Sequence, residues 1–107
     1  MVVEKLGIAD AIKPKAVVVD GTSGARVGAV VASGEAEMGL QLMSELLPIA
    51  GIDVIGPIPE ELQTQTSFSA AVPAKAKDSA TARMLVNYLR SEAATDLLKR
   101  KGLDVPW

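Results

Sequence analysis

The chain of 107 residues contains no cysteine and no histidine. This absence excludes disulfide bridges, Cys/His zinc sites, thiol nucleophiles and any mechanism that needs an imidazole near neutral pH. One Trp, one Tyr and one Phe are its only aromatic residues, which argues against a surface that stacks nucleic-acid bases. A net charge of −2 leaves no basic field to attract phosphate backbones, so we expect no nucleic-acid partner.

Long hydrophobic runs are also missing. No segment approaches the roughly 20 apolar residues of a membrane span, and residues 1–7 lack the apolar run of a signal peptide. The overall composition, 49% hydrophobic and 22% charged, is typical of one globular domain. A chain of this size buries about two-thirds of its unfolded surface, which makes its core marginal if that core is shared with other segments.

The first half of the chain indicates an α/β class. Residues 16–19 form an apolar run before Asp20 and Gly21, which predicts a strand buried on both faces. Small polar residues then precede an apolar stripe that ends at Gly34, which predicts a helix of about three turns. Residues 36–42 are apolar again, so strand, helix and strand follow one another as in a parallel sheet.

The second half contains shorter signals. They predict a brief helix, a strand, a helical turn and a half-buried strand over residues 43–47, 52–55, 59–62 and 64–72. Asp78 and Ser91 are each followed by apolar residues at helical spacing, so each predicts the N-cap of a helix. Basic residues at 99–101 and then Gly102 indicate where the second of these helices ends.

Small polar residues at 20–24 form the first candidate binding site. A strand that leads into a helix through Thr22, Ser23 and Gly24 leaves backbone N–H groups that can bind an anion, and the two hydroxyls can also donate. The alternative is an ordinary helix cap in a tight turn. The segment lacks the lysine and the spacing of a P-loop.

Gln41 and Ser44 form a second candidate site, because ligands of open α/β sheets bind outside the carboxyl ends of strands. The alternative is a solvated Gln41 and a Ser44 that caps a short helix. The hydroxyl row of residues 64–69 is most simply the solvent face of a strand. Glutamates show no pairing or ligand spacing, so we expect no catalytic residue, no metal site and no cofactor, and an enzyme that uses carboxylates alone ranks last.

Residues 33–40 read SGEAEMGL and are followed by QLMSEL at 41–46. This stretch resembles one found in bacterial ABC-transporter solute-binding proteins of the molybdate-binding type. The order of elements is similar too, with a polar helix start before the stretch and a Gly/Pro-rich crossover, a strand and two helices after it. The tail KRKGL at 99–103 is similar to the end of those proteins.

The resemblance implies part of a type II periplasmic binding-protein fold, with a parallel or mixed sheet flanked by helices. It implies that residues 1–48 correspond to part of lobe two, 49–63 to a crossover and 64–107 to part of lobe one. The implied function is non-catalytic: the protein binds a small polar or anionic solute in the periplasm or outside the cell and delivers it to the membrane permease of an ABC transporter. Because about 100 residues cannot supply both lobes, we expect the chain to complete its fold by self-association as a homo-oligomer.

The resemblance also transfers a ligand site. The family's oxyanion-binding helix start falls on Ser23 and Gly24, and the tyrosine that helps to hold molybdate falls on Leu42. Leucine has no hydroxyl, so Gln41 or Ser44 would substitute in binding another, organic solute. A ligand-sensing or self-associating module without a transport role is the alternative function.

Overall fold

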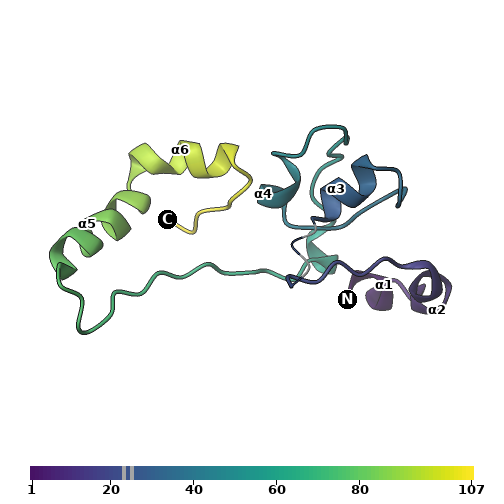
Figure 1. Cartoon of the computed structure of the whole chain (residues 1–107), viewed down its shortest axis with the longest axis horizontal. Helices are drawn as coiled ribbons and strands as arrows, with labels where there is room; N and C mark the ends of the chain where they lie inside the picture. Colours follow the sequence, from purple (N-terminus) through teal and green to yellow (C-terminus); the bar gives the residue numbers. More distant parts are fainter. Residues whose placement is uncertain (23, 25) are drawn as a thin grey trace. The chain divides into compact units, whose positions relative to one another are not determined.

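A computed structural model describes residues 1–22, 24 and 26–107, and it divides into two units (Figure 1). Unit 1 comprises Met1–Thr64, and unit 2 comprises Gln65–Trp107. The assignment of chain segments to lobes of a binding protein stays a prediction.

Unit 1 begins with three short elements that the sequence analysis did not predict. They are α1 (Val2–Lys5), α2 (Ala9–Ile12) and the 3₁₀ turn η1 (Lys13–Lys15), which pack against one another in sequence. The ammonium of Lys5 donates hydrogen bonds to the backbone carbonyls of Glu61 (3.2 Å) and Gln63 (3.3 Å). These bonds link the start of unit 1 to its end.

The rest of unit 1 contains α3 (Val27–Ala32), α4 (Met43–Leu46) and the 3₁₀ turn η2 (Glu60–Leu62). Helix α3 packs against α4. It was expected to run for three turns but has six residues, and it ends at Ser33 before Gly34, whose φ is +81°. The predicted brief helix at 43–47 is confirmed, since α4 ends where Leu47 leads into Pro48.

Unit 2 contains α5 (Ser79–Leu89) and α6 (Glu92–Arg100). Both predicted N-caps are confirmed: the Asp78 carboxylate accepts from the N–H of Thr81 at 2.9 Å, and the Ser91 hydroxyl accepts from the N–H of Ala94 at 3.4 Å. Gly102 follows α6 with a φ of +81°. The two helices pack against each other around Ala94, whose exposed fraction is 3%.

None of the described residues lies in a strand, so the predicted parallel or mixed sheet is not confirmed. A strand exists only where a neighbouring backbone completes a ladder of hydrogen bonds, and the segments at 16–19, 36–42, 52–55 and 64–72 have no such neighbour among the described residues. The expected burial is also wrong for these segments. Val18, Ile55 and Phe68 are 85%, 97% and 71% exposed.

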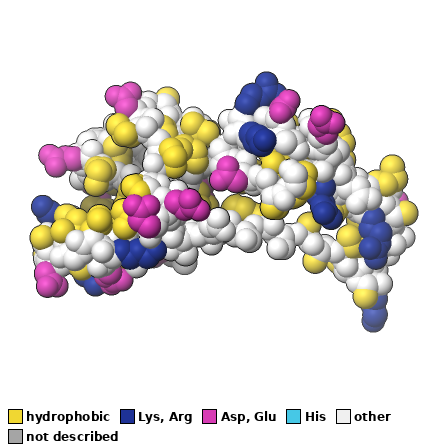
Figure 2. All heavy atoms as spheres, turned by 180° about the vertical axis from the view of Figure 1, so that it is seen from behind, with side chains coloured by type: hydrophobic (Ala, Val, Ile, Leu, Met, Phe, Trp, Pro, Cys, Tyr) yellow, Lys and Arg dark blue, Asp and Glu magenta, His cyan; other side chains and the backbone are white. Residues whose placement is uncertain are grey.

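Apolar side chains remain exposed on both units (Figure 2). The chain exposes 8902 Å² to solvent, whereas two independent globular domains of these sizes would expose roughly 6,800 Å² in total. The predicted apolar stripe of α5 is only partly covered, since Leu85 and Leu89 stay exposed. Among the described residues, no helix combines the length and the apolar character that a membrane span needs.

Candidate functional site

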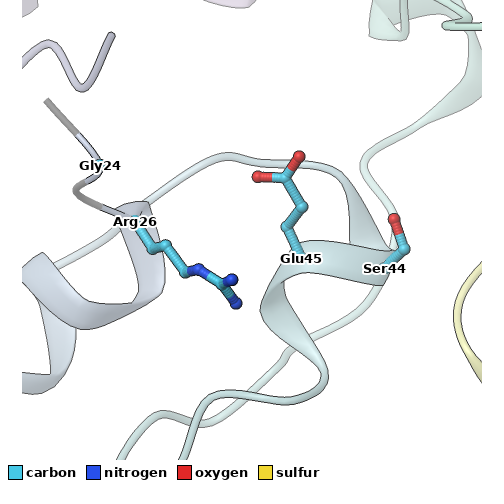
Figure 3. Close-up of a pocket in the computed structure, with 4 residues that line it drawn as sticks. All are labelled: Gly24, Arg26, Ser44 and Glu45. Carbon is cyan, nitrogen blue, oxygen red and sulfur yellow. The ribbon is translucent and has the colours of Figure 1, made fainter. Parts of the chain in front are cut away.

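A hollow of about 460 Å³ in unit 1 is lined by Gly24, Arg26, Ser44 and Glu45 (Figure 3). Gly24 and Ser44 come from the two separate segments that the sequence singled out, and the fold brings both to one hollow. Arg26 and Glu45 are additional. The side chain of Arg26 extends from the start of α3 towards α4, and Glu45 and Ser44 project from α4 itself (Figure 3).

Glycines set the spacing of the elements that surround the hollow. A Cβ atom at Gly39 would lie 2.5 Å from Cγ1 of Val27 and 3.0 Å from Cγ2 of Val31, so the segment after α3 packs directly on that helix. A Cβ atom at Gly28, which is buried in α3, would lie 2.9 Å from Cγ1 of Ile49. The lack of side chains at these two positions therefore fixes α3, and with it Arg26, relative to the segments before and after α4.

Arg26 gives the hollow its positive charge. It is the only Lys or Arg between residues 16 and 74, in a unit that contains four Lys or Arg and nine Asp or Glu. Within the described part of the chain, ion pairs involve only Glu4, with Lys13 and the terminal amino group, so neither Arg26 nor Glu45 is paired there. Sequence reasoning missed Arg26, although its isolation among acidic and apolar residues was a signal that could have found it.

The other predicted site residues lie elsewhere. The Thr22 hydroxyl donates to Oδ1 of Asp20 at 2.7 Å, and the Thr22 N–H donates to the same oxygen at 3.0 Å. The side-chain oxygen of Gln41 accepts from the N–H of Leu42 at 2.9 Å. Neither residue lines the hollow, and Ser23 lies outside the described residues. Local hydrogen bonds thus occupy the Thr22 hydroxyl and the Gln41 side-chain oxygen, two of the groups that were expected to face a ligand.

The start of α3 differs from the expected anion-binding helix terminus. Helix α3 begins at Val27 after Arg26, and no side chain caps it. Its six residues make fewer than two turns, too few to build up the dipole that was expected to hold an anion. The charge available at this position is therefore that of the Arg26 guanidinium.

The hollow combines one cation, one carboxylate and one hydroxyl. A guanidinium offers a planar fork of donors that matches the two oxygens of a carboxylate or of an oxyanion. The Ser44 hydroxyl both donates and accepts, whereas the Glu45 carboxylate only accepts. The arrangement can therefore bind an anionic group at Arg26 and a hydrogen-bond donor at Glu45.

Residues 1–104 match the family described as bacterial extracellular solute-binding protein. Aconitate isomerase from Pseudomonas sp is 44% identical over 77 residues, which cover 72% of this chain and 29% of that protein. The molybdate-binding protein ModA of Azotobacter vinelandii is 34% identical over 107 residues, covering 94% of this chain and 40% of that protein. ModA of Escherichia coli (strain K12) is 28% identical over 102 residues, covering 95% and 38%.

No solved structure matches the chain. The chain spans between 29% and 40% of the length of these curated relatives. The family match covers nearly all of its residues, in agreement with the resemblance seen in residues 33–46. The chain therefore belongs to the bacterial extracellular solute-binding protein family.

Proposed function

We propose that this chain forms part of a solute-binding protein and that the hollow of unit 1 binds the anionic group of a small solute. The observation that carries the proposal is the guanidinium of Arg26, which has no ion-pair partner among the described residues and lines one hollow together with Gly24 and Ser44. Transfer of the solute to the membrane permease of an ABC importer, in the periplasm or outside the cell, is the family role that we extend to it.

The chemistry of the hollow favours an organic carboxylate over a bare oxyanion. One relative is named for aconitate, a tricarboxylate, and two for molybdate, so an anion is common to all three names. Glu45 repels any anion near it but accepts a hydrogen bond from a hydroxyl or a protonated carboxyl. A solute that carries both a carboxylate and a donor satisfies Arg26 and Glu45 together, whereas molybdate satisfies only Arg26.

Calorimetry or NMR titration of the chain with trans-aconitate, citrate and molybdate tests this site. We expect dissociation constants on the order of millimolar, because an open hollow cannot bury a ligand as a two-walled cleft does. Arg26→Gln should weaken binding of every anion about tenfold or more. Lys15→Gln makes the same charge change away from the hollow and serves as the matched control.

Glu45→Gln separates the solute classes. Removal of this carboxylate should strengthen molybdate binding and weaken binding of a hydroxy acid that donates to it. If Arg26→Gln and Lys15→Gln weaken anion binding equally, the hollow is not the binding site. Tight stoichiometric binding of molybdate by the unmodified chain would refute the preference for an organic carboxylate.

We propose binding without catalysis, since this chain contains no histidine or cysteine and, among the described residues that line the hollow, Glu45 is the only carboxylate. The similarity to an aconitate isomerase makes turnover the direct check. Incubation of the chain with trans-aconitate should yield no cis-aconitate by chromatography. Formation of the cis isomer, and its loss in Glu45→Gln, would instead identify Glu45 as a proton-transfer residue.

Self-association is the second candidate function. The chain exposes roughly 2,100 Å² more than two finished domains would, which is of the order of a stable protein–protein interface. A homo-oligomer would cover this surface. Sedimentation equilibrium should show a dimer or larger species at micromolar concentrations, and a monomer at all concentrations would refute this candidate.

A further inference from the structure

A second hollow, of about 320 Å³, lies in unit 2 between α5 and the extended segment before it. Arg83 and Asn87 line it from α5, and Arg90 lines it from the C-cap position that directly follows the helix. Their spacing of four and three residues is that of one helix face. Its apolar lining consists of Ala70, Val72 and Val86. We call this hollow the arginine groove.

The arginine groove contains two cations without a carboxylate partner. Neither Arg83 nor Arg90 forms an ion pair within the described chain. The guanidinium carbon of Arg90 lies over the Trp107 ring, 5.7 Å from its centroid, within the range of a cation–π contact. Unit 2 contains seven Lys or Arg and four Asp or Glu, so the groove lies in a basic surrounding.

In unit 1, the segment that follows α3 carries negative charge. Glu35 and Glu37 are exposed and form no ion pair within the described part. The neighbouring side chains of Met38 and Leu40 are 76% and 49% exposed. This acidic segment, residues 35–40, combines two carboxylates with two uncovered apolar side chains, which mirrors the two arginines and the apolar lining of the groove.

Both regions also have unpaired backbone. The main-chain groups of residues 37–41 and of residues 64–72 form no hydrogen bond with one another or with other described residues. Extended segments with free N–H and C=O groups pair readily with a segment of another chain. Charge and backbone pairing therefore favour the same two surfaces.

We propose that the arginine groove of one copy binds the acidic segment of a second copy, with Glu35 and Glu37 paired to Arg83 and Arg90. Each chain carries both surfaces, so either copy can supply the groove or the acidic segment. The inference rests on the self-association proposed above and names the surface that mediates it.

Charge reversal in the full chain tests this pairing. Glu35→Lys with Glu37→Lys, and separately Arg83→Glu with Arg90→Glu, should each raise the dimer dissociation constant at least about tenfold in sedimentation equilibrium. An equimolar mixture of the two variants should restore association, because each supplies the charge that the other lacks. Lys75→Glu with Lys77→Glu, two exposed residues outside the groove, is the control and should associate normally.

The outcomes separate the two proposals. Far-UV circular dichroism of each variant establishes that α5 and α6 remain folded. A wild-type chain that stays monomeric overturns both self-association and the named surface. Variants that associate as the wild type does, or a mixture that fails to associate, overturn the named surface and leave self-association standing.

Discussion

Gly39→Ala is expected to destabilise unit 1 and to displace the cation of the candidate site. A Cβ at this position would lie 2.5 Å from Cγ1 of Val27, whereas two carbon atoms in contact lie about 3.5–4.0 Å apart. Valine side chains in a helix have one strongly preferred rotamer, so α3 itself must move by roughly 1 Å. Overpacking of this kind costs about 1–3 kcal/mol, and Arg26 moves with the helix because it directly precedes Val27.

Urea unfolding followed by circular dichroism measures the loss of stability, and titration with trans-aconitate measures the effect on the site. Gly21→Ala is the matched control, because a Cβ there meets no atom within 4 Å and the φ of Gly21 is not positive. This control should be unchanged or more stable by about 0.4–1 kcal/mol. Val27→Ala should partly rescue Gly39→Ala, and equal stability of Gly39→Ala and Gly21→Ala would refute the packing argument.

Three further predictions concern stability. Gly28→Ala should also destabilise unit 1 by about 1–3 kcal/mol, because its Cβ would lie 2.9 Å from Cγ1 of Ile49. Urea unfolding measures this loss of stability, and an unchanged unfolding midpoint would contradict the prediction. Ser91→Ala should cost about 1 kcal/mol by loss of the α6 cap, seen as reduced helicity on heating relative to wild type. Hydrogen bonds from Lys13 and then from the terminal amino group lower the pKa of Glu4 from 4.5 to about 2. Its contribution to stability is thus present above pH 4.5 and lost as the pH falls towards 2, and Glu4→Gln should remove that part of the pH profile.

The two C-terminal helices could be predicted because their signals are local. Asp78 and Ser91 cap the helices that directly follow them, and Gly102 follows the second one with the positive φ that glycine tolerates. The strands could not be predicted from such local signals, since a strand forms only when a backbone segment from elsewhere in the chain pairs with it. Apolar runs alone gave no sign that Val18 would be exposed.

The candidate site was predicted in part. Gly24 and Ser44 were chosen from separate motifs, and the fold places both on one hollow. Thr22 and Gln41 were chosen for their hydrogen-bonding groups, but the Thr22 hydroxyl and the Gln41 side-chain oxygen bond to neighbouring groups in the chain. Arg26 was missed because it belongs to no motif. Its place at the hollow depends on the packing of α3 against α4 and on the close approach of Gly39 to α3, and no periodic pattern in the sequence indicates either contact.

The large exposed surface has a consequence for how the chain unfolds. An unfolded chain of this mass exposes roughly 16,100 Å², and the folded chain already exposes 8902 Å². The surface newly exposed on unfolding is therefore about a quarter smaller than it would be for two finished domains of the same sizes. The denaturant m-value scales with the surface exposed on unfolding, so we expect a small m-value and a broad urea transition for this chain. Any partner that covers the exposed apolar side chains would steepen the transition as well as shift its midpoint, which makes the slope a direct report of how complete the fold is.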